Sequence, residues 1–256
     1  MTLLVTGASG YLGRELMRRA GDAVGVHRGS EPPLDVRDPA AVDALFERLR
    51  PDAVIHTAYA QGDRATTCDG AVAVARAAAR GGARLVHLST DVVFDGEKGS
   101  PYIEDDEPLP LTDYGRDKAD AERGVLDAHP AALVVRTSLI YGGPEPGPQE
   151  RLAADSGATF FTDEVRCPIQ VGDLADALLE LTGSDRTGFL HVAGADALSR
   201  HAFAELLAGG PVQGATVAES GSVRPRDCSL AIDRAKALLR TRLRGAREVL
   251  ERPRDP

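Results

Sequence analysis

The chain has 256 residues, a length that suits one large domain or a main domain with a small appendage. Its 30 basic and 39 acidic residues give a formal net charge of −9, which argues against nucleic acid or an anionic membrane as the main partner, because both need a basic face. No apolar run approaches the ~20 residues of a membrane span, and no secretory signal precedes the first predicted strand, so we expect a cytoplasmic protein.

The first 140 residues alternate short apolar runs with segments of helical spacing. The runs are rich in β-branched residues, as strands buried on both faces of a parallel sheet are. Asp38-Pro39 has the form of an N-cap followed by proline at the first helical position. This alternation predicts an α/β fold with a doubly wound parallel sheet of Rossmann type. Predicted strands are Leu3–Val5, Ala23–Val26, Ala53–Ile55, Leu85–Leu88 and Leu133–Val135, and predicted helices are Tyr11–Ala20, Pro39–Leu49, Ala71–Arg80 and Tyr114–Ala128.

The pattern becomes less regular after Tyr141. We expect a dinucleotide-binding domain over residues 1–141, with 170–193 returning to it, and a smaller C-terminal substrate lobe over 142–169 and 194–256. The Pro- and Arg-rich end, Glu251–Pro256, is expected to be frayed. The remaining predictions are a loop over Gly142–Pro148, a helix over Val171–Leu181, a strand over Phe189–Val192, helices over His201–Leu207 and Ala231–Leu239, and no clear period over Gly209–Val223.

A glycine-rich turn, Thr6-Gly7-Ala8-Ser9-Gly10-Tyr11-Leu12-Gly13, follows the first predicted strand directly. Its first glycine permits the tight turn, the second allows a pyrophosphate to approach, and the third allows close packing of helix on strand. The helix N-terminus then offers free N–H groups to the anion. The residues expected to bind a dinucleotide here are Gly7, Ser9, Gly10, Tyr11, Leu12 and Gly13.

The end of the second predicted strand favours NADP(H) over NAD(H). A site that prefers NAD usually has an acidic residue there, which binds the ribose 2′-hydroxyl. This chain has Arg28 instead, with His27 beside it, and a guanidinium suits the 2′-phosphate of NADP. Asp35 and Val36 follow a few residues later, at a position from which they can contact the adenine amino group. NAD(H) stays open as the alternative cofactor.

Tyr114 and Lys118 are spaced i and i+4, which puts both side chains on one face of a helix. A free tyrosine has a pKa of ~10, and a neighbouring ammonium lowers it toward the range that general acid–base catalysis requires. With 5 tyrosines and 3 lysines in 256 residues, only ~0.06 such pairs are expected by chance. Ser89 and Thr90 end the fourth predicted strand, where a hydroxyl can hydrogen-bond a substrate oxygen beside Tyr114.

Together these features resemble the extended short-chain dehydrogenase/reductase superfamily, and within it the branch of dTDP-4-dehydrorhamnose reductases. The resemblance covers essentially the whole chain. The stretches that carry it are Thr6–Gly13, Ser89-Thr90-Asp91-Val92-Val93-Phe94-Asp95-Gly96, the run from Glu107-Pro108 through Tyr114-Gly115 to Lys118, Arg136-Thr137-Ser138, and Arg224-Pro225-Arg226 followed by Ser229-Leu230.

The resemblance implies a catalytic triad in which Thr90 supplies a hydroxyl, Tyr114 is the general acid and Lys118 holds the nicotinamide ribose. It also implies that the segment after the third strand, beginning at His56, lines the cofactor. The contacts expected there are Thr57, Ala58 and Tyr59. The implied substrate contacts are Thr90, Asp91 and Arg224, with Arg226 as a second cation toward an anionic group such as a diphosphate.

Two departures from the branch concern the sugar. Leu139 and Ile140 follow Ser138, where members that form rhamnose place an aromatic residue. The segment 141–165 is also short for the branch. The resemblance therefore specifies the fold better than the identity of the sugar.

The function implied is that of an oxidoreductase, an NADP-dependent reductase that transfers a hydride to the keto group of a nucleotide-linked 4-keto-sugar. A non-catalytic NADP-binding regulatory subunit stays open, because the same branch includes the regulatory β-subunit of methionine adenosyltransferase. A sugar-nucleotide epimerase stays open too. A dehydratase is disfavoured, since dehydratases of the superfamily carry Asp-Glu after the strand-end threonine, and here Asp91 precedes Val92. The expected partner is a small molecule, with neither nucleic acid nor membrane, and a homodimer stays open.

The 3 cysteines, Cys68, Cys167 and Cys228, are isolated from one another in the sequence. An odd, scattered set predicts reduced thiols in the cytoplasm and no disulfide framework. No Cys-x-x-Cys motif or Cys/His cluster is present, so no metal is expected.

Overall fold

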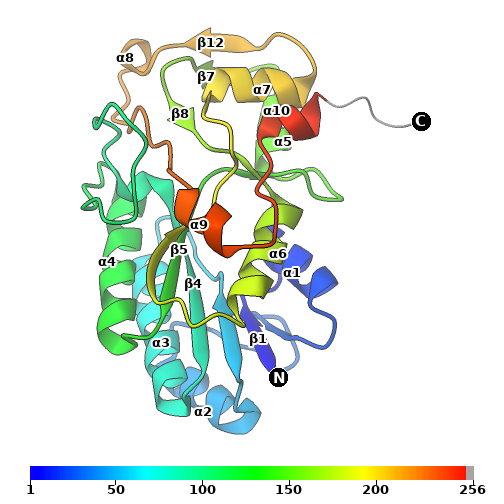
Figure 1. Cartoon of the computed structure of the whole chain (residues 1–256), viewed down its shortest axis with the longest axis vertical. Coiled ribbons are helices and arrows are strands. Elements are labelled where there is room, and N and C mark those ends of the chain that lie inside the picture. Colours follow the sequence, from blue (N-terminus) through cyan, green and yellow to red (C-terminus); the bar gives the residue numbers. More distant parts are fainter. Residues whose placement is uncertain (252–256) are drawn as a thin grey trace. The chain divides into compact units, whose positions relative to one another are not determined.

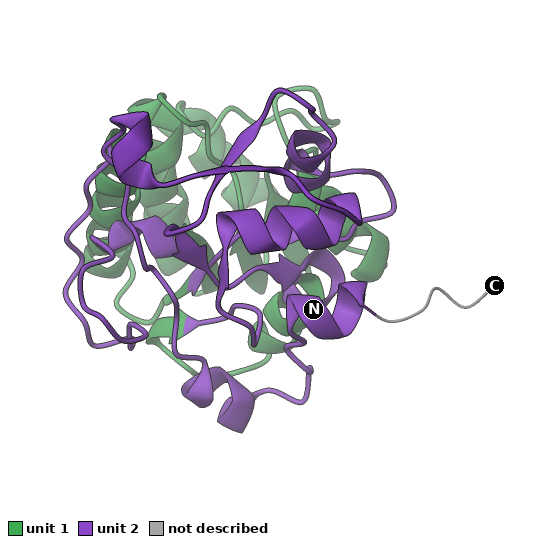
Figure 2. Ribbon diagram, turned by 90° about the horizontal axis from the view of Figure 1, so that it is seen from above, with its two compact units in different colours: residues 1–90, 113–135, 175–190 green, residues 91–112, 136–174, 191–256 purple. Residues whose placement is uncertain are grey.

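The computed structural model describes residues 1–251, which fall into two compact units (Figure 2). Unit 1 comprises residues 1–90, 113–135 and 175–190, and unit 2 comprises 91–112, 136–174 and the chain from residue 191 onward. Residues 252–256, which form most of the end expected to be frayed, lie outside the described residues.

Segment 91–112 belongs to unit 2, although the predicted dinucleotide-binding domain includes it. The reason is a set of contacts with residues far along the chain. The N–H of Tyr102 donates to the carbonyl of Ser229 at 2.8 Å, and Tyr102 forms an isolated parallel bridge with Leu230. Such pairings over more than a hundred residues have no local signal in the sequence.

Unit 1 is built on a six-stranded sheet with the strand order β10-β5-β4-β3-β1-β2 (Figure 1). The pairs β1–β2, β1–β3 and β3–β4 are parallel, which confirms the predicted doubly wound sheet. Because the strand order changes direction at β1, the switch point at which such sheets bind ligands lies at the carboxyl ends of β1 and β3. The strands are β1 (Leu3–Thr6), β2 (Val24–Val26), β3 (Ala53–His56), β4 (Arg84–Thr90), β5 (Leu133–Thr137) and β10 (Gly188–His191).

Helices α2, α3 and α4 pack on one face of this sheet, and α1 and α6 lie on the other (Figure 1). The apolar stripe of α2 fills the core with Val42, Leu45 and Phe46. The predicted cap of α2 is confirmed, since Asp38 Oδ1 accepts from the N–H groups of Ala40 and Ala41. The helices are α1 (Tyr11–Arg19), α2 (Pro39–Leu49), α3 (Gly70–Gly81), α4 (Asp113–Ala128) and α6 (Val171–Leu181).

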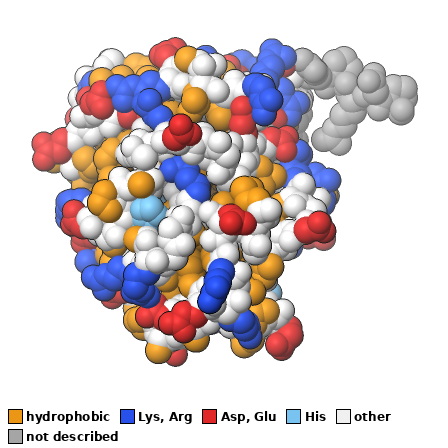
Figure 3. All heavy atoms as spheres, turned by 60° about the horizontal axis from the view of Figure 1, so that its bottom comes forward, with side chains coloured by type: hydrophobic (Ala, Val, Ile, Leu, Met, Phe, Trp, Pro, Cys, Tyr) orange, Lys and Arg blue, Asp and Glu red, His pale blue; other side chains and the backbone are white. Residues whose placement is uncertain are grey.

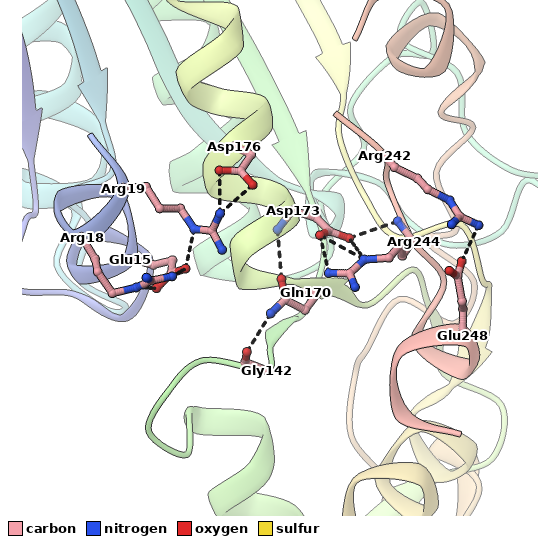
Figure 4. A network of polar contacts seen from close by, with 10 residues as sticks. All are labelled: Glu15, Arg18, Arg19, Gly142, Gln170, Asp173, Asp176, Arg242, Arg244 and Glu248. Carbon is pink, nitrogen blue, oxygen red and sulfur yellow. Dashed lines mark hydrogen bonds and ion pairs between the residues drawn. The ribbon is translucent and has the colours of Figure 1, made fainter. Parts of the chain in front are cut away.

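Ion pairs hold α6 at its first turn and at its middle, each within its own unit (Figure 4). In unit 1, Arg19 Nη1 contacts Asp176 at 2.6 Å, and the same guanidinium donates to the buried carboxylate of Glu15 at 2.5 Å. In unit 2, Asp173 in the first turn of α6 accepts two charge-assisted hydrogen bonds from Arg244, at 2.6 and 2.9 Å. A carboxylate at the start of a helix is also favoured by the helix dipole.

Unit 2 is made of short elements and three two-stranded sheets, β6–β9, β8–β11 and β7–β12. The segment without a clear period, Gly209–Val223, contains β12 and α8, and α5 begins where the predicted loop ends. The strands are β6 (Ile140–Tyr141), β7 (Thr159–Phe161), β8 (Val165–Arg166), β9 (Ile169–Gln170), β11 (Leu198–Ser199) and β12 (Gln213–Ala215), and the helices are α5 (Pro148–Ala153), α7 (Arg200–Ala208), α8 (Val217–Ser220), α9 (Asp233–Leu238) and α10 (Ala246–Leu250).

The surface carries charges of both signs, and basic and acidic side chains are interspersed on the face in Figure 3. All three cysteines are buried and free. Between residues 1 and 251, no helix combines the length and apolar character that a membrane span requires. Over the same range, no group of three or more His, Cys, Asp or Glu side chains is arranged to hold a metal ion.

Candidate active site

A pocket of about 210 Å³ lies in unit 1 at the carboxyl ends of β1, β2 and β3, which is the switch point of the sheet. Nine of its lining residues are among those predicted to bind the cofactor. These nine are Gly7, Ser9, Gly10, Arg28, Asp35, Val36, Thr57, Ala58 and Tyr59, and the other lining residues are Val26, His27, Leu34, Ala60, Asp63 and Thr66.

The glycine-rich turn requires glycine at two positions for steric reasons. Gly7 has φ of +74°, and a Cβ on it would lie 2.7 Å from the backbone nitrogen of Ala58. A Cβ on Gly13 would lie 2.1 Å from the carbonyl oxygen of Gly7. Gly10 is the N-cap of α1 and provides no side-chain cap, so the first N–H groups of the helix face the turn without a side-chain acceptor at that position. This turn can therefore approach a phosphate closely.

Two residues expected at the adenosine end, Arg28 and Asp35, both line the pocket. Hydrogen bonds from Arg37, with a smaller effect of the charge on Arg28, lower the pKa of Asp35 to about 2. The Asp35 carboxylate is therefore ionised at neutral pH, and Arg37 holds it at 2.6 Å. No acidic residue stands directly at the end of β2, where the chain continues as His27 and Arg28.

The predicted general acid lies on α4, beside the pocket. The ring of Tyr114 is 5.8 Å from that of Tyr59, a pocket residue that is 55% exposed. Lys118, one turn later, is buried, and its Nζ donates to the carbonyl of Leu88 at 2.6 Å. Burial lowers the pKa of Lys118 to about 8. Thr90, the third member of the predicted triad, is the last residue of β4 and is half-buried.

Two residues near this site, His56 and Ser89, are buried in the core and do not face the pocket as the sequence suggests. His56 does not line the pocket, because it is buried in β3, with Nδ1 2.6 Å from Thr6 Oγ1 and its ring stacked on His87. Burial lowers the pKa of His56 to about 3. Ser89 points into the core of unit 1 and donates to Glu122 at 2.5 Å.

Sequence reasoning missed the wall of the pocket that follows Tyr59, including Asp63 and Thr66. Asp63 caps the π-helical turn Ala65–Asp69 by accepting from the N–H and the hydroxyl of Thr66, at 3.1 and 2.7 Å. An Asp three residues before a Thr is a weak capping signal, and it does not place the turn against a pocket.

The predicted substrate residues of unit 2 lie in a network of ion pairs. Asp91 is buried, accepts from Ser138 Oγ at 2.6 Å and lies 3.7 Å from Arg166. Arg224 contacts Glu164 at 2.6 Å, and its guanidinium lies 5.1 Å from the centre of the Phe161 ring. The Arg224 side chain is nevertheless 42% exposed. Arg226 pairs with Glu97 at 2.8 Å.

A further arginine, Arg200, lies in this network. Burial lowers the pKa of Arg200, and the charges acting on it come from Glu164, Arg166, Arg224 and Asp91. Arg200 donates to Gln149 at 2.9 Å and has no ion pair within 4.0 Å among residues 1–251. This part of unit 2 therefore brings the guanidiniums of Arg166, Arg200 and Arg224 close to the carboxylates of Asp91 and Glu164.

The sheet, the glycine-rich turn and the Tyr114/Lys118 pair define a dinucleotide-binding α/β protein of the short-chain dehydrogenase/reductase type. Comparison with known families extends this assignment. The family model described as RmlD substrate binding domain matches residues 1–252, and the chain belongs to that family.

Similar proteins agree with this membership. A probable dTDP-4,6-dihydroxy-2-methyloxan-3-one 4-ketoreductase of Streptomyces antibioticus is 40% identical over 197 residues, which cover 70% of this chain and 66% of that protein. A dTDP-4-dehydrorhamnose reductase of Mycobacterium tuberculosis is 37% identical over 219 residues, covering 77% and 71%. The crystal structure of a dTDP-4-dehydrorhamnose reductase from Bacillus anthracis, in complex with NADP, has a TM-score of 0.87 at 26% identity and covers 98% of both chains.

Proposed function

We propose that the chain is an NADP-dependent reductase that transfers a hydride to the keto group of a nucleotide-linked sugar, with a 4-keto-sugar as the substrate. The observation that carries this proposal is the position of Tyr114 beside Tyr59 of the pocket, with Lys118 buried one helical turn away. The related proteins named above act on dTDP-linked keto-sugars, and the structural neighbour contains NADP.

The residues of the pocket fit a dinucleotide. A Cβ on Gly7 or Gly13 would collide with backbone atoms, so glycine at both positions allows the close packing through which the backbone and the N-terminus of α1 can hold a pyrophosphate. Arg28 would hold the 2′-phosphate, and Asp35 with Val36 would contact the adenine. When bound, the reduced nicotinamide supplies the hydride.

Protein groups supply the proton and orient the substrate. Tyr114 would hold a proton at its hydroxyl and transfer it to the oxygen that becomes an alkoxide as the carbonyl is reduced. The Lys118 ammonium would lower the pKa of that phenol, and Thr90 would hydrogen-bond the same substrate oxygen. A neutral phenol far from any cation would be a poor acid at neutral pH.

The substrate proposed is anionic because Arg166, Arg200 and Arg224 lie in one network of unit 2, where they can face an anionic group. Arg224, whose side chain is 42% exposed, would contact the diphosphate, and Asp91 would contact the sugar. Arg200 lies in the same network and is a further cation there. The cytoplasmic location and the homodimer stay predictions.

Replacing Tyr114 with Phe tests the proposal. The wild-type protein should oxidise NADPH in the presence of at least one member of a panel of nucleotide-linked keto-sugars. Tyr114→Phe removes the proton donor and keeps the ring, so turnover should fall ~10²–10⁴-fold while NADPH binding persists.

Tyr141→Phe is the matched control, because its hydroxyl is buried in unit 2 and has no hydrogen-bond partner in the described chain. Turnover of this variant should equal that of the wild type. A Tyr114→Phe variant with normal turnover, or a wild type inactive on the whole panel while it binds NADPH, would favour a non-catalytic NADP-binding subunit.

A further inference from the structure

A buried carboxylate lies on α4 below the catalytic pair. Glu122 is 1% exposed, Ser89 is 3% exposed and Lys118 is 4% exposed. Ser89 Oγ donates to Glu122 Oε1 at 2.5 Å, which joins the end of β4 to α4 inside the core of unit 1. A carboxylate buried this deeply costs free energy unless charges and hydrogen bonds compensate it, so its partners indicate what it does.

The spacing along α4 places Glu122 in line with the catalytic residues. Tyr114, Lys118 and Glu122 are separated by four residues each, so the three side chains follow one face of the helix. The Lys118 ammonium donates to the Leu88 carbonyl and has no ion pair within 4.0 Å in the described residues. Glu122 therefore acts on Lys118 through its charge rather than by direct contact.

The other titratable groups that face Lys118 do not replace this charge. His56 and His87 lie on β3 and β4, and burial, followed by the charge on Lys118, lowers the pKa of both imidazoles, which leaves them neutral. Cys68 lies in the π-helical turn, and burial raises the pKa of its thiol. Two groups, Glu122 and Cys68, can act on Lys118 through a negative charge, and Glu122 is the carboxylate of the two.

We infer that Glu122 is a positioning residue for the reduction: its buried negative charge keeps Lys118 protonated, and the Lys118 ammonium in turn keeps Tyr114 acidic. This role rests on the proposed function. Ser89 contributes by fixing the carboxylate with a hydrogen bond from the end of β4.

The burial of Lys118 determines the direction in which removal of the Glu122 charge should shift the pKa of Lys118. Desolvation disfavours the ammonium and lowers the pKa of Lys118 to about 8, while Glu122 opposes this decrease. Without the carboxylate the pKa of Lys118 should fall further, so that Lys118 is largely neutral at pH 7.5. A neutral lysine cannot lower the pKa of the Tyr114 phenol.

A direct test is to titrate Lys118 by NMR, since the chain has only 3 lysines. In protein labelled with [¹³Cε]lysine, the Lys98 and Lys236 signals can be assigned with Lys98→Arg and Lys236→Arg, which leaves Lys118. Glu122→Gln keeps the shape and the acceptor for Ser89 but removes the charge. We expect the pKa of Lys118 to fall by about one unit or more in this variant. A pKa equal to that of the wild type would overturn the inference.

Two further variants separate charge from packing. Ser89→Ala keeps the carboxylate, so it should lower the pKa of Lys118 less than Glu122→Gln does. Should Glu122→Gln fail to fold, Glu122→Met with Ser89→Ala replaces the hydrogen-bonded pair by apolar groups, an exchange that cores often tolerate, and it should lower the pKa of Lys118 in the same way.

Kinetics then connect the charge to catalysis. If Lys118 must be protonated, the alkaline limb of the pH profile of kcat should move to lower pH in Glu122→Gln by the shift that NMR measures, and Glu122→Asp should restore part of it. If the alkaline limb of the kcat profile did not move in Glu122→Gln, the inference that the charge of Glu122 supports catalysis would be overturned. A wild type without reductase activity would instead refute the proposed function, and the NMR titration would still decide whether Glu122 controls Lys118.

Discussion

Two arginines close to the pocket of unit 1 differ in what they can bind. Arg37 is held by Asp35 at 2.6 Å and lies 3.7 Å from Asp63, so its charge is already compensated. Arg28 lines the pocket and forms no ion pair within 4.0 Å in the part of the chain from residue 1 to 251. Arg28 is therefore the cation that a phosphate group can reach without displacing a carboxylate.

Replacing Arg28 should change the choice of cofactor. Loss of a charge-assisted contact to phosphate costs ~1.5–3 kcal/mol, so Arg28→Ala should weaken NADPH binding about tenfold or more and leave NADH binding nearly unchanged. Fluorescence titration with both cofactors measures this. Arg48→Ala, which removes an exposed arginine from α2, is the matched control and should change neither affinity. Equal losses for both cofactors in Arg28→Ala would contradict the assignment to the 2′-phosphate.

At the scale of elements, the approach of α1 to β1 determines the shape of the turn between them. The backbone at Gly13 packs so closely on the carbonyl of Gly7 that no side chain fits, which brings the N-terminus of α1 to the end of the sheet. The absence of a side chain at Gly13 therefore determines the position of the whole helix, and it shapes the turn proposed to bind the pyrophosphate.

Gly13→Ala should accordingly displace α1. Because its Cβ would meet backbone atoms, which cannot rotate away, we expect a loss of ~1–3 kcal/mol in the free energy of unfolding, together with weaker NADPH binding. Urea unfolding and cofactor titration give the two values. Gly81→Ala is the control, because nothing lies within 4 Å of the added Cβ at the end of α3, and it should be neutral or slightly stabilising. If Gly13→Ala and Gly81→Ala had equal effects, the close contact between Gly13 and Gly7 would not determine the stability or the NADPH binding.

The helices and strands that the sequence predicts correctly are those whose capping residues and apolar spacing lie within one short segment of the chain. Helices α2 and α6 have the predicted bounds because capping residues and apolar spacing lie within each segment. The strands of unit 2 lack such signals: β12 pairs residues 213–215 with 159–161, and neither run is long enough to show a period. Their partners come from distant parts of the chain, so only the folded protein reveals them.

The same distinction applies to the site. The glycine-rich turn, Arg28 and the Tyr114/Lys118 pair carry motifs, and all but Lys118 are found in or next to the pocket. Glu122 carries no motif, since a glutamate on a helix is usually exposed, and its burial depends on Ser89 approaching from β4. Its i+4 spacing from Lys118 is the signal that could have been used.

At the scale of the whole molecule, buried neutral histidines link stability to pH. Burial lowers the pKa of His56 in unit 1 and of His191 in unit 2 to about 3 each. In the unfolded chain both should titrate near the ordinary value of ~6.5. Between these values the unfolded state binds more protons than the folded state, so stability should fall as the pH drops.

We therefore expect the free energy of unfolding to decrease between pH 6.5 and 5, at up to ~1.4 kcal/mol per pH unit for each such histidine. Urea unfolding at several pH values between 8 and 5 measures the slope. His191→Phe, which keeps an aromatic ring beside Phe94, should reduce that slope, while the difference between the two proteins should stay constant above pH 7.5. An unchanged slope below pH 6.5 would mean that His191 becomes protonated in the folded state.

The burial of Cys68, Cys167 and Cys228 has a practical consequence for measuring motion. Burial raises the pKa of all three thiols, so maleimide dyes should leave the native cysteines unmodified while the protein stays folded. Single cysteines introduced at the exposed positions Glu47 in unit 1 and Leu238 in unit 2 would then be the labelled sites. Energy transfer between two such dyes would show whether the distance between the units changes when NADPH is added, without removal of any native core residue.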